Sequence, residues 1–211
     1  MPDVTLGKQF DRIFQVASGT RFLNREGLGN EVPFFIQPYQ PADQREVYRN
    51  IAELEKRLRA AGITPVMLSV YDIVLDVLRE TDRFEAVAAM EPRMKKHEGR
   101  RSFLSEIKKF VGPDHGKHVV AMIRRLLDET PGHSLAIMYR LGEAYPYLRT
   151  HDLLNNLHSV ISDVPLLVFF PGEYVSSDER GFYLSLFGRF NGEYYRAFKL
   201  DDYIKRSTSR G

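Results

Sequence analysis

The sequence predicts an α/β fold: a three-layer domain with a mostly parallel sheet. Short apolar runs alternate with stretches of helical periodicity, which is the pattern of strands joined by crossover helices. Two of these runs, 64–70 and 164–170, are apolar on both faces, as strands between two helical layers are. A length of 211 residues suits one domain, so we expect residues 1–211 to fold as a single unit.

The first part of the chain predicts two helices and two strands. Apolar residues at helical spacing predict a helix over 6–17, and the apolar run 32–36 predicts a short strand. A long helix is expected from Pro41 to Gly62, because proline suits a first turn and glycine suits the end of a helix. The run 64–70 is then the second strand.

Helices and two further strands are expected next. Helical patterns at about 72–130 predict a helical insertion, which is followed by a third strand over 134–139. A loop and a helix over 148–160 lead to the fourth strand, 164–170. We expect this strand to stop at the Pro-Gly pair 171–172, because that pair favours a turn.

The end of the chain has the pattern of a β-hairpin. Two aromatic-rich segments, 182–187 and 194–200, flank a turn that contains Asn191 and Gly192. We therefore expect a C-terminal antiparallel hairpin at about 182–200, added to one edge of the sheet.

Composition excludes several classes of protein. Because the chain has no cysteine, it has no disulfide, thiolate metal site or thiol nucleophile. No apolar run reaches the roughly 20 residues of a membrane helix, and the first residues lack the pattern of a secretory signal. We therefore expect a cytoplasmic protein without membrane contact. The net charge of +2 does not by itself indicate a nucleic-acid partner.

The common catalytic and cofactor motifs are missing. The sequence has no Gly-x-x-x-x-Gly-Lys-Ser/Thr phosphate loop and no Gly-x-Ser-x-Gly elbow. His115 and His118 are spaced to share one face of a helix, but no acidic residue is spaced to complete a metal site. We therefore expect no metal, no cofactor and no enzyme activity. The sequence does not identify a small-molecule ligand.

One stretch of the predicted insertion is locally basic. A solvated helix face is the ordinary interpretation of such a stretch. The alternative is a phosphate-facing patch, which would make the chain a nucleic-acid- or nucleotide-binding degenerate NTPase-like domain in weak contact with DNA. The residues of this candidate patch are Lys108, Lys109, Arg124 and Arg125.

Loops at the carboxyl ends of the strands form a candidate rim, because ligands of parallel sheets bind there. If the third and fourth strands are neighbours, Arg149 and His151 approach Glu173 and Tyr174. His151 with Glu143 or Glu173 would then be an acid–base pair. A lone histidine near the start of a helix is more often structural, so we assign no catalytic residue.

Four segments, in this order, resemble the BrxB family of bacteriophage-exclusion (BREX) proteins, and the resemblance covers nearly the whole chain. The segments are GLGNEVPF at 27–34, YPYLRTHDLLNNL at 145–157, VFFPGEY at 168–174 and YYRAFKL at 194–200.

The resemblance implies a small core subunit of a phage-defence system. It implies an adaptor that docks the alkaline-phosphatase-like protein PglZ and works with other BREX components, and it carries over no enzyme activity. Aromatic residues and arginine, which are enriched at protein interfaces, are frequent in the chain as a whole. The residues expected to bind partners are Tyr145, Pro146, Arg149, His151, Pro171, Gly172, Tyr174 and Arg196.

Overall fold

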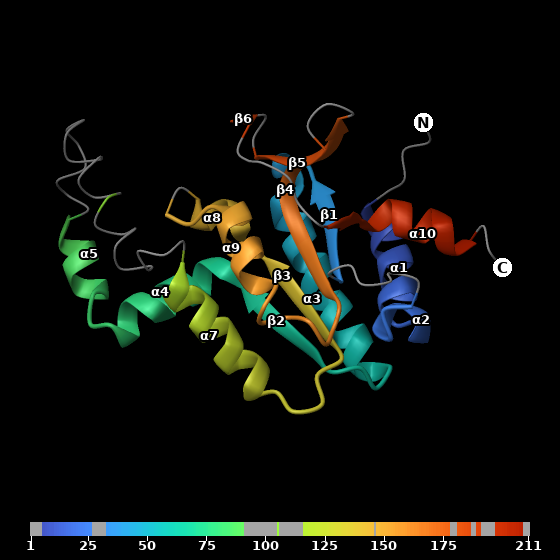
Figure 1. Ribbon diagram of the computed structural model, residues 1–211, viewed down its shortest axis with the longest axis horizontal. Helices are drawn as coiled ribbons and strands as arrows, with labels where there is room; N and C mark the ends of the chain where they lie inside the picture. Colours follow the sequence, from blue (N-terminus) through green and yellow to red (C-terminus); the bar gives the residue numbers. More distant parts are fainter. Residues whose placement is uncertain are drawn as a thin grey trace.

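The computed structural model describes residues 6–26, 33–90, 105, 116–145, 147–177, 181–186, 189–190 and 197–208. It confirms the predicted α/β fold with a mostly parallel sheet and helices on both faces (Figure 1). The strand order is β2-β3-β4-β1-β7, and every neighbouring pair in this order is parallel.

The first part of the fold follows the sequence closely. Helix α1 spans Leu6–Ala17, as predicted, and the short helix α2 spans Thr20–Leu23. Strand β1, Phe34–Tyr39, leads through a 3-10 turn at Pro41–Asp43 into α3, Gln44–Ala60. Gly62 has a φ of +78°, the left-handed conformation that a glycine adopts easily after a helix. Strand β2 is Pro65–Ser69.

Helices make up most of the described parts of the predicted insertion, 72–90 and 116–130, and two short helices precede the fourth strand. After β2 come α4, Val70–Glu80; α5, Phe84–Met90; and α7, Lys117–Asp128. Strand β3, Leu135–Tyr139, is followed by α8, Leu141–Ala144, and by α9, Thr150–Leu157. The residues of α8 were expected in a loop, and α9 is shorter than the predicted 148–160 helix.

The C-terminal part departs from the prediction. Strand β4 runs over Leu166–Ser177 and does not stop at the Pro-Gly pair, because its chain bends there and continues into an antiparallel pairing. β5, Gly181–Leu186, pairs with the far part of β4 and with β6, Arg189–Phe190.

The predicted pairing of 182–187 with 194–200 is wrong. β7, Phe198–Lys199, lies parallel to β1 at the edge of the main sheet, and α10, Leu200–Thr208, follows it. An antiparallel hairpin is present, but β5 and β6 form it.

The sheet separates two apolar cores. Phe34 and Ile36 of β1 lie in the core beneath α4, α7 and α9, whereas Phe35 between them lies in the core beneath α1 and α3. This alternation follows because successive side chains of a strand point to opposite faces. All three side chains are at most 1% exposed, so β1 is central to both cores.

Candidate functional site

The order of the strands reverses between β4 and β1. From β1 the chain passes through α3 to β2 at one edge of the sheet, and it returns through β3 to β4 beside β1. From β4 it continues past β1 to β7 on the other side. In open α/β sheets, ligands bind at the carboxyl ends of the two strands that flank such a reversal.

A pocket of about 510 Å³ lies at this position. The end of β1 contributes Tyr39, the following turn contributes Asp43, and Lys199 comes from β7. Glu173 and Tyr174 come from β4 beyond its bend, and Leu6 and Gln9 of α1 close another side. The expected binding residues Gly172 and Tyr174 therefore do line a cavity.

Pro171, Gly172 and Tyr174 also have a structural role in β4. Pro171 is buried and stands opposite Tyr39 of β1 in the parallel register. Gly172 has a φ of +147° and stands opposite Leu186 of β5, so the main sheet ends and the antiparallel pairing begins at this residue. Tyr174 is 7% exposed, and its hydroxyl donates to the carbonyl oxygen of Ala197 at 2.5 Å.

An arginine-centred cluster lies at the ends of β2 and β3. The guanidinium of Arg140 contacts Asp72 at 2.6 Å, forms an ion pair with Glu143 and lies over the ring of Tyr71. The amide of Gln44, in the first turn of α3, donates to Glu143 at 3.3 Å. The cluster therefore ties together the loops after β1, β2 and β3.

Arg140 was not among the residues expected at the site. It follows β3 in the left-handed conformation, with a φ of +61°. Burial acts to lower the pKa of Arg140, but the hydrogen bonds to Glu143 and Asp72 outweigh it and hold the pKa above its ordinary value. The sequence signal that could have found it is a charged residue directly after a buried strand, with a carboxylate three positions later.

Three tyrosines line the same end of the sheet on the α3 side. The hydroxyl of Tyr39 donates to that of Tyr48 at 3.4 Å, and the rings of Tyr48 and Tyr139 meet edge to face. Burial is the main reason why the pKa of each of the three hydroxyls is raised. These hydroxyls therefore stay neutral at physiological pH and do not act as bases.

The predicted rim on α8 and α9 is partly assembled. Tyr145 at the end of α8 is 37% exposed and is the exposed large hydrophobic residue of the described part of the chain. Arg149 precedes α9 and is exposed. His151 contacts Asp152 at 3.0 Å, whereas the side chain of Glu143 is bound to Arg140.

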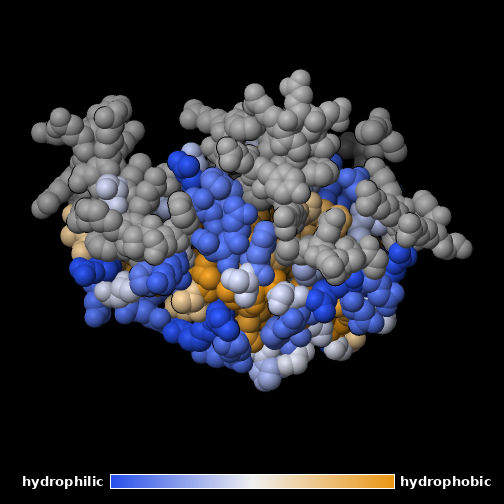
Figure 2. All heavy atoms as spheres, in the orientation of Figure 1, coloured by the Kyte–Doolittle hydropathy of each residue, from blue (hydrophilic) through white to orange (hydrophobic). Residues whose placement is uncertain are grey.

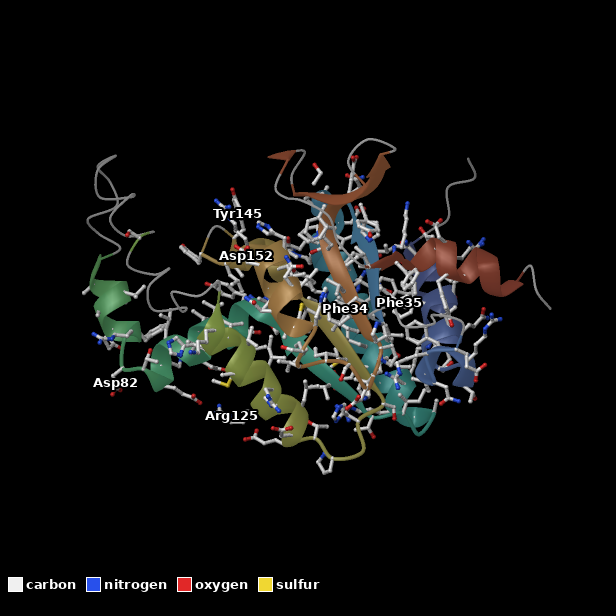
Figure 3. All side chains as sticks on the ribbon, in the orientation of Figure 1. Phe34, Phe35, Asp82, Arg125, Tyr145 and Asp152 are labelled. Atoms are coloured by element: carbon white, nitrogen blue, oxygen red, sulfur yellow. The ribbon has the colours of Figure 1, made fainter. Side chains whose placement is uncertain are left out.

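One of the two described residues of the candidate basic patch, Arg125, is paired with acids. Arg124 and Arg125 are both exposed on α7. Arg125 binds Glu80 of α4 through two nitrogens, at 2.5 and 3.1 Å, and lies 3.7 Å from Glu129. The hydrogen bond from Arg125 lowers the pKa of Glu80. Figure 3 places Arg125 on α7, away from Tyr145.

The family model for "BREX protein BrxB" matches residues 66–200, which is well over half of the chain. The chain belongs to the BrxB family. Two relatives, each described as "BREX protein BrxB", match over almost their whole length. The one from Bacillus cereus (strain H3081.97) is 28% identical over 93% of this chain and 98% of its own. The one from Escherichia coli O9:H4 (strain HS) is 29% identical over 95% of this chain and 94% of its own.

The BrxB match establishes that the chain is similar to components of BREX phage defence, as the four sequence segments implied. No solved structure matches the chain. The stretch matched by the family model contains the Arg140 cluster except for Gln44, and the whole rim on α8 and α9.

Two of the expected binding residues, Pro146 and Arg196, and two residues of the candidate basic patch, Lys108 and Lys109, lie outside the described residues. Within the described ranges, no group of three or more His, Cys, Asp or Glu side chains is placed to hold a metal ion. No helix in those ranges is long and apolar enough to cross a membrane.

Proposed function

We propose that this chain is a cytoplasmic, non-catalytic adaptor subunit of a BREX phage-defence system, and that it docks the PglZ-like protein and other BREX components. The observation that carries the proposal is that Tyr145, at the end of α8, and Arg149, directly before α9, are both exposed. Tyrosine and arginine are the side chains that most often dominate the binding energy of an interface. Both residues lie within the stretch that the BrxB family model matches.

Ion pairs of Arg140 fix the start of α8, the helix directly before Tyr145. Arg140 is fixed on both sides by Asp72 and Glu143, and it starts the helix that ends at Tyr145. A docking residue on a fixed support loses little conformational freedom on binding, which favours affinity. On the face seen in Figure 2, hydrophilic residues cover most of the described surface, around an apolar area near its middle.

Alanine substitution of the rim tests the docking proposal. We expect Tyr145→Ala and Arg149→Ala each to weaken binding of the PglZ-like protein by about tenfold or more, because truncating an interface anchor costs on the order of 2 kcal/mol. Isothermal titration calorimetry with the two purified proteins measures this. Arg45→Ala, an exposed arginine on α3 outside the matched stretch, is the matched control. Unchanged affinity in both rim variants, with native thermal stability, would exclude docking at the rim.

The variant His151→Ala distinguishes a non-catalytic adaptor from an enzyme. His151 is the sequence-predicted candidate base, and its contact is Asp152 in its own helix. A histidine held by its neighbour at the start of a helix serves the fold, so we expect His151→Ala to leave phage restriction intact at normal protein level. Loss of restriction with unimpaired binding of the PglZ-like protein would instead indicate catalysis at this rim.

A further inference from the structure

We propose that the pocket between β1, β4 and β7 binds an organic cation, a guanidinium or alkylammonium group. The pocket lies at the reversal of the strand order, where α/β sheets place their ligands. The shared chemistry is a positively charged nitrogen group on an aliphatic stem. Its source is either a free polyamine or the basic side chain of a bound protein.

The lining combines aromatic rings with carboxylates. Tyr39 and Tyr174 are each 7% exposed and present walls of the cavity, and Asp43 and Glu173 are exposed at its rim. Tyrosine rings attract cations through their electron-rich faces, and carboxylates add Coulomb attraction. Neither carboxylate forms an ion pair with a residue that the structure describes, so within the described part of the chain both charges are open to a ligand.

The turn after β1 disfavours the opposite ligand, a phosphate. The start of a helix binds phosphate through free backbone N–H groups and its positive dipole end. Here Pro41 removes one N–H group, and Asp43 places a negative charge directly before α3. The side-chain amide of Gln44 in the first turn of that helix donates to Glu143, so it is already engaged.

Lys199 provides a test of the sign of the ligand's charge. It lines the pocket from β7 and is the cation among the lining residues that the structure describes. If the ligand is a cation, Lys199 repels it, and removing the ammonium must strengthen binding. If the ligand were an anion, Lys199 would be its main attraction, and the same change would weaken binding.

The experiment is calorimetric titration of the full chain at low ionic strength with three cationic probes and one anion. Agmatine and spermidine represent free polyamines, a Gly-Arg-Gly peptide blocked at both ends represents a protein side chain, and pyrophosphate is the anion. We expect Glu173→Gln to weaken cation binding and Lys199→Met to strengthen it, each by about two- to fivefold, because the rim charges are exposed and screened. Glu85→Gln, an exposed carboxylate on α5, is the control and leaves affinity unchanged.

The proposal is supported if any cationic probe binds, Glu173→Gln weakens that binding and Lys199→Met strengthens it. The cationic probe that binds most tightly shows whether the ligand is a free polyamine or a protein side chain. The proposal is overturned if no cationic probe binds, if Glu173→Gln has no effect, or if pyrophosphate binds and Lys199→Met abolishes it. The outcome does not depend on docking at Tyr145, because α8 and α9 contribute nothing to the pocket lining.

Discussion

Gly172→Ala is the single substitution that we expect to damage this fold most for its size. Gly172 is the residue at which β4 passes from the main sheet to the antiparallel pairing with β5. Its φ of +147° lies in a region that residues with a side chain rarely adopt. A β-carbon there would lie 3.1 Å from the ring of Phe170 and 3.2 Å from the carbonyl carbon of Ser185, and closer still to the Ser185 oxygen.

The expected cost has two parts. Holding alanine at this φ costs about 1–3 kcal/mol, which is the range for a strained backbone conformation. The close approach of the Ser185 backbone adds about 1–3 kcal/mol, the range for overpacking, because a backbone atom cannot rotate away as the end of a side chain can. Together these predict a loss of about 2–6 kcal/mol in the free energy of unfolding, a large share of the stability of a domain.

Urea denaturation followed by circular dichroism measures this loss against two matched glycines. Gly62→Ala keeps a positive φ, +78°, but meets nothing within 4 Å, so we expect a loss of only about 1 kcal/mol. Gly7→Ala lies in α1 with open space around it, so it is neutral or stabilises by up to about 1 kcal/mol. If Gly172→Ala cost no more than Gly62→Ala, the close approach of β5 to the bend would be refuted.

Three further changes test the interior and the Arg140 cluster. Gln37 of β1 is 3% exposed; its Nε2 donates to the carbonyl oxygen of Pro38 at 3.2 Å, and its Oε1 has no hydrogen-bond partner among the described residues. Gln37→Leu removes one weak hydrogen bond and one unsatisfied buried oxygen, so we expect the free energy of unfolding to change by no more than about 1 kcal/mol in urea denaturation. A larger loss would mean that the amide makes a further hydrogen bond. Arg140→Ala leaves the carboxylates of Asp72 and Glu143 without their cation. Because the cluster is partly exposed, we expect the free energy of unfolding to fall by about 1–2 kcal/mol in the same measurement. An unchanged urea midpoint would mean that these ion pairs do not contribute to stability. Burial raises the pKa of the Tyr48 hydroxyl above 10.0, so the contribution of this group to stability is complete below pH 10 and falls as the pH rises further. We therefore expect Tyr48→Phe to lose less thermal stability than the unchanged protein between pH 9 and pH 11. An equal loss in both proteins would contradict a buried Tyr48 hydroxyl.

The sequence predicts the fold where periodicity and local chemistry agree. Helix α1 and the long helix closed by Gly62 carry a regular apolar stripe and distinct ends, so both follow from the sequence. The bounds of α1 are as predicted, whereas α3 begins three residues after Pro41, because 41–43 form a 3-10 turn. Strands β2 and β3 are apolar runs between helical patterns and are also found. The strand order was not predicted, because it depends on which buried surfaces pack together and not on any local pattern.

Prediction failed where distant contacts decide the structure. Gly172 normally favours a turn, but here its unusual φ lets β4 bend and continue, which only the pairing with β5 reveals. Phe198 and Lys199 look like one side of a hairpin, yet they pair with β1, more than 160 residues earlier in the sequence. The Arg140 cluster joins residues that follow three different strands, so the sequence spacing indicates the Arg140–Glu143 pair but not the approach of Asp72 and Gln44.

The central position of β1 leads to a last prediction, which is whether the stretch matched by the family model can fold without it. The family model covers 66–200, but β1 lies between β4 and β7 and supplies Phe34, Phe35 and Ile36 to both cores. Burying three such side chains contributes on the order of 5–9 kcal/mol, comparable with the whole stability of a domain. It follows that residues 66–211 alone would not fold.

We expect that fragment to lack cooperative thermal unfolding and to show no slowly exchanging amides, in contrast to the full chain. The control is a deletion of residues 1–5, which leaves α1, β1 and both cores complete. A cooperative transition in the 66–211 fragment would contradict the argument, because it would mean that β4 and β7 need no strand between them. The pocket is lined by residues of α1 and β1, whereas the rim on α8 and α9 is not. If the 66–211 fragment does not fold and the control does, the pocket and the rim belong to one folding unit.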